Sequence, residues 1–217
     1  MALSKVDFNS INVTPAASKA IKFNSSNNGF ETGDVGGSLV LLETQTLSSA
    51  ASTITFDSNI DSTYKEYIFK YTDIHLANAA HFRVNFRDGS TAYDATKSTT
   101  YFLTHHSEND ADNSLTYVTG KDLAQSTDPA ILSQDFYSGG NDSAIAGSLH
   151  LFDPSSTTFV KHFIANTQGQ FVDSSNPYSV NAFLAGYCNT TTAIDGVQFG
   201  TSSGNIDSGT IKMYGVS

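Results

Sequence analysis

The sequence predicts an all-β protein, an antiparallel two-sheet sandwich of jelly-roll-like topology with an extended N-terminal arm. Short runs with apolar residues at alternate positions recur along the chain, and turn residues separate them. Charged residues make up only 15% of the 217 residues, while 15 Phe and 10 Tyr provide large side chains for a core. The sequence shows no heptads, no long repeat and no long amphipathic helix. We therefore expect two packed sheets with little helix, and another Greek-key sandwich is the second choice.

Residues 1–37 are predicted to be the N-terminal arm, and residues 38–217 the β-sandwich domain. The arm has weak periodicity and ends in the glycine-rich junction at residues 33–37, with one short strand expected at residues 20–23. A single domain fits the remaining length, because all-β domains often reach this size undivided. We expect the arm to attach the protein to a larger assembly, and a flexible terminus without a partner is the alternative.

The first strands of the domain are expected at residues 38–46, 52–57 and 66–74. In the third of them, Tyr67, Phe69 and Tyr71 share one face of the strand, while Ile68 and Lys70 share the other. This alternation of large apolar and more polar faces is typical of a strand with one buried side.

Residues 81–90 show the clearest strand pattern in the chain. Phe82, Val84 and Phe86 alternate with polar residues, so we predict that these three side chains are buried. Asp88 and Gly89 follow directly and are predicted to form a hairpin-type turn.

Later strands are expected at residues 100–105, 147–153, 158–166, 179–187, 195–201 and 209–215. In the last of them Ile211 and Met213 alternate with polar neighbours, and we expect this end of the chain to be built into the sheet. The segment 90–140 is longer and more polar than its surroundings, and its role stays open. A short helix is possible at residues 120–132, interrupted by Asp128 and Pro129.

Composition and charge exclude several classes of function. The formal net charge is −10, and no run of Lys and Arg exists, which argues against binding nucleic acid or anionic membranes.

No apolar run has the length of a membrane span, and residues 1–10 lack the apolar core of a signal peptide. We expect folding in a reducing cytoplasm without export. Cys188 is the only cysteine, so no intrachain disulfide forms, and we expect a small buried side chain.

The histidines do not predict a metal centre. His105 and His106 are adjacent, and adjacent residues of a strand point to opposite faces, so they cannot chelate one ion as a strand pair. His150 and His162 are placed so that they could be neighbours across a hairpin, but a metal site needs three or four converging ligands.

An acidic loop is expected at residues 107–114, where Glu108, Asp110 and Asp112 occupy alternate positions. Oxygen ligands in this pattern suit calcium, but the EF-hand pattern is not fulfilled. A solvated acidic loop is the favoured interpretation, and a calcium ion between Glu108 and Asp112 is the alternative.

Catalytic signatures are missing from the sequence. It has no Gly-x-Ser-x-Gly elbow, no phosphate loop and no dinucleotide fingerprint. Ser148, His150 and Asp153 lie close along the chain, but a triad is defined by geometry rather than by sequence proximity. A pair of glycosidase carboxylates brought together by folding stays open. We expect no catalytic residues, no metal and no cofactor.

One loop has the residues of a surface-binding site. Residues 133–142 combine aromatic and short polar side chains, and the candidates are Phe136, Tyr137, Asn141 and Asp142. Aromatic faces pack on sugar rings, and short polar side chains supply adaptable hydrogen bonds. The alternative is a loop whose two aromatic rings turn into the core.

Four segments carry a resemblance to a known family: residues 1–5, 20–33, 58–75 and 208–217. They resemble the β-domains of tail-fibre and other virion structural proteins of marine bacteriophages, of the cyanophage or pelagiphage type. The similarity covers the arm, an early strand and the last strand, and residues 90–200 carry no recognisable motif.

This resemblance implies a non-enzymatic virion subunit, which could be a fibre, a knob or a capsid-decorating protein. Its implied partners are other virion proteins, further copies of itself in a homotrimer, and host-surface glycans. The alternative is a carbohydrate-binding, lectin-like module or an enzyme that acts on polysaccharide, because a sandwich supports either function. The location on head or tail and the receptor stay open.

Overall fold

The computed structural model describes residues 19–26, 28–34, 39–134, 143–173 and 176–217. The chain divides into two compact units, Met1–Ser38 and Leu39–Ser217. The described part contains fourteen strands and one short 3₁₀ helix, η2 (Thr119–Lys121). The strands are β1 (Lys19–Phe23), β2 (Phe30–Asp34), β3 (Leu39–Thr46), β4 (Thr53–Phe56), β5 (Glu66–Leu76), β6 (Phe82–Arg87), β7 (Lys97–Ser107), β8 (Asn113–Tyr117), β9 (Ala130–Ile131), β10 (Ile145–Phe152), β11 (Lys161–Asp173), β12 (Asn176–Cys188), β13 (Gly196–Thr201) and β14 (Ile206–Val216).

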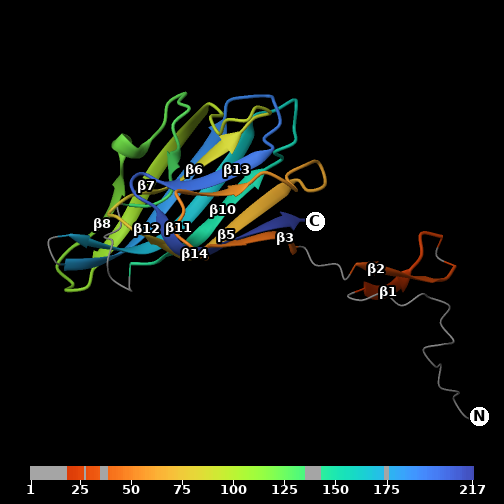
Figure 1. The fold of residues 1–217 in the computed structure, drawn as a ribbon, viewed down its shortest axis with the longest axis horizontal. Helices are drawn as coiled ribbons and strands as arrows, with labels where there is room; N and C mark the ends of the chain where they lie inside the picture. Colours follow the sequence, from red (N-terminus) through yellow and green to blue (C-terminus); the bar gives the residue numbers. More distant parts are fainter. Residues whose placement is uncertain (1–18, 27, 35–38, 135–142, 174–175) are drawn as a thin grey trace, which may run out of the picture. The chain divides into compact units, whose positions relative to one another are not determined.

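The predicted fold class is confirmed, because the second unit is an antiparallel two-sheet sandwich (Figure 1). One sheet has eight strands in the order β3-β14-β5-β10-β11-β12-β7-β8, and the other has four in the order β4-β13-β6-β9. Successive strands from β3 to β7 alternate between the two sheets, and the chain crosses again around β9 and β13. These repeated crossings are the kind of connection that a jelly-roll-like sandwich requires. In the described ranges, no helix is long and apolar enough to span a membrane.

Every predicted strand overlaps an observed one, including the short strand at residues 20–23, which lies in β1. The first unit also contains a second strand, β2, that the sequence did not predict, and β1 and β2 form an antiparallel hairpin in which Phe23 pairs with Phe30. In the segment 90–140, the predicted helix is reduced to η2, and two further unpredicted strands are present, β8 and β9.

The turn predicted at Asp88 and Gly89 needs a correction. Gly89 has a positive φ of 84°, as turn glycines often do, but it does not close a hairpin. The strand before it, β6, pairs with β13 and β9, whereas the strand after it, β7, pairs with β12 and β8. The turn therefore begins a crossing from the smaller sheet to the larger one.

The middle of the sandwich is a cluster of five fully buried rings, here called the aromatic centre: Phe56, Phe69, Tyr71, Phe82 and Phe199. The larger sheet contributes two of them from β5, and the smaller sheet contributes the other three. Phe199 is central, since its ring centroid lies 5.6 Å from that of Phe82 and 5.7 Å from that of Phe69. The predicted burial of Phe82, Val84 and Phe86 is confirmed, because all three are fully buried.

A different kind of buried cluster closes one end of the larger sheet. Cys188 on β12 lies opposite Lys97 of β7 on one side and Lys161 of β11 on the other, and all three side chains are completely buried. We call these three residues the lysine row. The Lys97 ammonium donates to the carbonyl of Asp128 at 2.8 Å, and the Lys161 ammonium donates to the carbonyl of Thr190 at 3.0 Å. Both lysines therefore hold loops that close the sandwich.

Candidate binding groove on the outer sheet face

The eight-stranded sheet has one face toward the four-stranded sheet and one outer face. Along β7, β11 and β12 the burial alternates, so that inner residues are buried and outer ones are partly or largely exposed. Several outer residues are nevertheless large and apolar, among them Phe102, Tyr117 and Ile164. Exposed apolar side chains gathered on one sheet face are typical of a contact surface.

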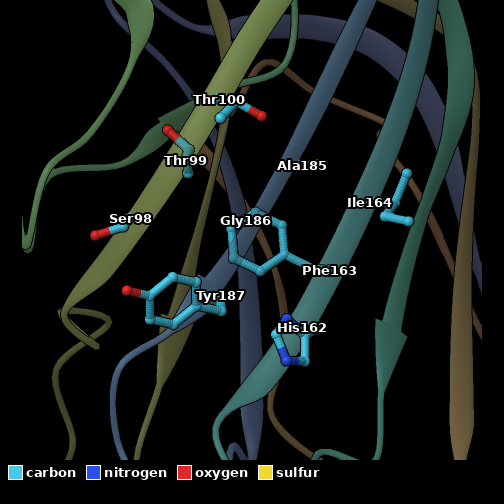
Figure 2. Close-up of a pocket in the computed structure, with 9 residues that line it drawn as sticks. All are labelled: Ser98, Thr99, Thr100, His162, Phe163, Ile164, Ala185, Gly186 and Tyr187. Carbon is cyan, nitrogen blue, oxygen red and sulfur yellow. The ribbon is translucent and has the colours of Figure 1, made fainter.

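A groove of about 440 Å³ lies on this outer face across three neighbouring strands (Figure 2). Its lining residues are Ser98, Thr99 and Thr100 of β7, His162, Phe163 and Ile164 of β11, and Ala185, Gly186 and Tyr187 of β12. The sheet register explains this set, since residues directly opposite each other in antiparallel strands share a face.

Two rows of cross-strand neighbours form the groove. Ala185 lies between Thr100 and Ile164, and its small side chain leaves a depression between larger neighbours. In the other row, Tyr187 lies between Ser98 and His162, and the rings of Tyr187 and His162 are 6.0 Å apart at an angle of 53°.

Gly186 lies between these rows and faces inward. A Cβ atom at this position would lie 2.7 Å from the Phe163 ring and 2.6 Å from the carbonyl oxygen of Ser98. Such distances are too short for any side chain, so the three strands pack here as closely as they do only because residue 186 is glycine.

The groove suits a ligand with a flat apolar side. The Tyr187 ring and the Ala185 side chain offer apolar contact, and Ser98, Thr100 and His162 add polar groups beside them. One of them, the Ser98 hydroxyl, already accepts a 2.7 Å hydrogen bond from the Gln125 side chain, which holds the neighbouring loop against β7. Such a mixture fits the face of a sugar ring or an apolar protein surface.

The outer face continues beyond the groove with aromatic and amide side chains. Phe102 and Phe183 are cross-strand neighbours whose rings stack at 4.8 Å and 11°. Beside them, Asn166 and Asn181 donate amide hydrogen bonds to each other at 2.8 and 3.2 Å, and Asn181 also donates to Gln168 at 3.2 Å. The groove is thus one part of a wider surface of aromatic and amide groups.

The four residues proposed from the sequence as a surface-binding loop, Phe136, Tyr137, Asn141 and Asp142, lie outside the described residues. The groove was not predicted from the sequence. The sequence predicts strands at residues 158–166 and 179–187, and successive residues of a strand point to opposite faces. The pairing of β7, β12 and β11, which brings the groove residues together, is not visible in any one of those segments.

The acidic loop connects β7 to β8, and two of its acids lie beside histidines. His105 Nε2 is 3.3 Å from a carboxylate oxygen of Asp112, and His106 Nε2 is 3.1 Å from one of Asp110. His105 is partly buried and His106 is exposed, as expected for adjacent strand residues. Within the residues that the structure describes, no three His, Cys, Asp or Glu side chains are placed to hold a metal ion.

The remaining sequence candidates are separated by the fold. His150 lies opposite Ile164 in the register, so it is not the direct cross-strand neighbour of His162. Its Nδ1 is 2.6 Å from a carboxylate oxygen of Glu66, while Asp153 pairs with Lys65 at 2.8 Å. The sequence run that contains Ser148, His150 and Asp153 therefore does not form a triad.

Comparison of this chain with models of known protein families, with curated proteins and with solved structures finds no match.

Proposed function

We propose that this protein is a non-enzymatic structural subunit of a bacteriophage virion, which anchors by its N-terminal unit and displays the β-sandwich. The observation that carries the proposal is the exposed aromatic pair on the β1–β2 hairpin. Phe23 is 67% exposed and Phe30 is 49% exposed, and their rings stack at 5.1 Å.

Such a hairpin needs a partner to be stable. An isolated two-stranded hairpin is at best marginally stable in water, and further strands or another packed element give it independent stability. Phe23 and Phe30 of the β1–β2 hairpin are exposed, and Ile21 on β1 is exposed as well. Aromatic side chains concentrated on a small exposed surface are typical anchors of a protein interface. In this proposal the partner is another virion protein.

The display role rests on the second unit. The sandwich has its own continuous core, in which both sheets take part, so it holds its shape independently of what the first unit binds. Its outer sheet face then supplies the surface for contact with the host. In a homotrimer, three copies of this face are brought together, and weak contacts to a repetitive surface add by avidity.

Carbohydrate recognition is the second candidate function. The observation that favours it is the groove, in which the Tyr187 ring and Ala185 are accompanied by the hydroxyl groups of Ser98 and Thr100. A sugar presents an apolar ring face and peripheral hydroxyls, which matches this arrangement.

The anchoring role is tested by replacing the aromatic pair in the full chain. The double variant Phe23→Ser with Phe30→Ser removes both rings, and Phe159→Ser is the matched control, because Phe159 is a 70% exposed aromatic residue of the sandwich. We expect the double variant to remain folded but to be missing from purified particles, while the control is incorporated. Incorporation of the double variant at the wild-type level would refute the anchor.

Two further measurements separate the remaining alternatives. Light scattering of the purified protein and of the particle-derived subunit tests the trimer, and a strictly monomeric species in both would reject it. An assay of reducing sugars released from host polysaccharide tests the enzyme alternative. Turnover that a single acidic substitution abolishes would reject the non-enzymatic role.

A further inference from the structure

A second depression lies on the opposite side of the larger sheet from the groove. It has a volume of about 280 Å³ and is found toward the β8 edge. Its lining residues are Leu103 and His105 of β7, Thr116 of β8, Phe171 of β11, Tyr178 and Val180 of β12, and Asp112, Val118, Lys121 and Gln134 from the connecting segments. Leu103 and His105 alternate with the outward residues of β7, so this inner pocket and the outer groove are separate sites.

One side of the inner pocket is apolar and partly aromatic. The rings of Phe171 and Tyr178 lie 6.1 Å apart, and the His105 ring meets the Tyr178 ring edge-on at 5.4 Å and 86°. Leu103 and Val180 add buried aliphatic surface beside them. This side offers flat apolar contact of the size of one small ring.

The pocket also contains two buried polar atoms whose hydrogen-bonding capacity is not used. The Oε1 atom of Gln134 and the Nε2 atom of His105 are both buried, and neither has a hydrogen-bond partner. The nearest carboxylate to that nitrogen, Asp112, is 3.3 Å away. A buried polar atom without a partner is unfavourable, so the Gln134 oxygen calls for an explanation, and a bound ligand supplies one.

The charges of the pocket favour a neutral ligand. The pocket lining contains one ammonium group, that of Lys121, and one carboxylate, that of Asp112. The Lys121 ammonium also contacts the His81 ring at 3.1 Å. The chain as a whole carries a formal charge of −10, which repels anions at long range. A ligand without net charge avoids both the repulsion and the desolvation of a buried ion.

We propose that the inner pocket binds a single neutral pyranose residue. Sugar hydroxyls donate and accept hydrogen bonds, so they can donate to Gln134 Oε1 and to the Asp112 carboxylate while accepting from Lys121. The C–H face of the ring packs against Tyr178 and Phe171. The volume corresponds to about nine waters at about 30 Å³ each, which is room for one sugar ring and not for a chain of them.

The test uses the full chain and four methyl glycosides as probes, those of glucose, galactose, mannose and N-acetylglucosamine, in an NMR titration. Gln134→Met removes the unpaired oxygen and keeps the shape of the side chain, while Gln168→Met is the matched control on the outer face. We expect at least one glycoside to bind with a Kd of about 1 mM, and Gln134→Met to weaken it about tenfold or more. Gln168→Met should bind as the wild type does.

A second variant guards against misfolding. The Asp112 side chain is about half exposed, so Asp112→Asn should leave the fold intact and still weaken binding. The proposal is overturned if no glycoside binds, if Gln134→Met binds like the wild type, or if Tyr187→Ala in the outer groove abolishes binding instead. The pocket does not depend on the anchoring role, because the Phe23→Ser and Phe30→Ser double variant should bind the glycoside with unchanged affinity.

Discussion

The aromatic centre and the lysine row are equally buried, but they are held together by different forces. In the aromatic centre, rings from both sheets contact one another, and Phe199 has four ring neighbours between 5.6 and 6.2 Å. In the lysine row, Cys188 is flanked by two ammonium-bearing side chains that reach loop carbonyls.

The difference shows what each part of the core requires. Where the two sheets cover each other, the strand ladders pair backbone groups with one another, and packed rings make the contact between the sheets. Where loops close the sandwich, backbone carbonyls have no ladder partners. There Lys97 and Lys161 bury their aliphatic stems and use their ammonium groups to satisfy those carbonyls.

The largest effect is expected in the aromatic centre. Phe199→Ala removes the ring that contacts both sheets, so the free energy of unfolding should fall by about 3–5 kcal/mol, as for other large-to-small core substitutions. Chemical denaturation of the two proteins measures this difference.

Phe159→Ala is the control for Phe199→Ala, because Phe159 is 70% exposed, and its effect should stay within about 0.5 kcal/mol. If Phe199→Ala behaved like this control, the aromatic centre would not be the main stabilising contact between the sheets.

The next effect concerns the close packing at Gly186, two residues before Cys188 on β12. Its missing Cβ is what allows Phe163 and the backbone of β7 to approach, so Gly186→Ala should destabilise the protein by about 1–3 kcal/mol. Gly120→Ala is the matched control, since nothing lies within 4 Å of the added methyl group there. Equal stability of the two variants would show that β12 can shift without loss.

These two regions also show how far the sequence could predict the structure. Alternation within one segment is local information, and it identified the buried face of β6 and of β5. β8 could not be found in this way, because none of its residues is buried and no alternation results. β9 has only two residues, which is too short for any periodicity.

Sheet pairing was the part that the sequence did not determine. Lys97 and Lys161 look like solvent-facing residues in their segments, and only the register places both beside Cys188. The groove and the inner pocket depend on the same non-local information. Each combines residues from strands that are distant along the chain, with side chains whose individual types are unremarkable for a sheet.

A smaller effect is expected in the dependence of stability on pH. Burial lowers the pKa of Lys97 from its ordinary value of 10.5 to about 8. Between these values the unfolded chain binds a proton that the folded protein has released, so the free energy of unfolding should rise with pH. For this one group the rise between pH 8 and pH 9 is about 1 kcal/mol.

Lys97→Met isolates this contribution. Its stability should lack the rise, so the difference between wild type and variant should grow by about 1 kcal/mol over the same window. Contributions from Lys161 and Cys188 are common to both proteins and cancel to first order. A constant difference between pH 8 and pH 9 would show that the Lys97 ammonium group is not desolvated.

The last prediction concerns the chemical reactivity of Cys188 and not the stability of the fold. Burial raises the pKa of its thiol from 9.0 to about 12, although Lys97 and Lys161 on either side act in the opposite direction. Because only the thiolate reacts with alkylating agents, the native protein should resist iodoacetamide at pH 8, while the denatured protein should react at the rate of a free cysteine. Mass spectrometry after a timed reaction measures both rates.

Any slow labelling of the native protein reports local opening of the lysine row. The same measurement on Phe199→Ala tells whether the lysine row and the aromatic centre open together. If the native protein reacted as fast as the denatured one, the lysine row would be open to solvent. It would then not be buried as the aromatic centre is.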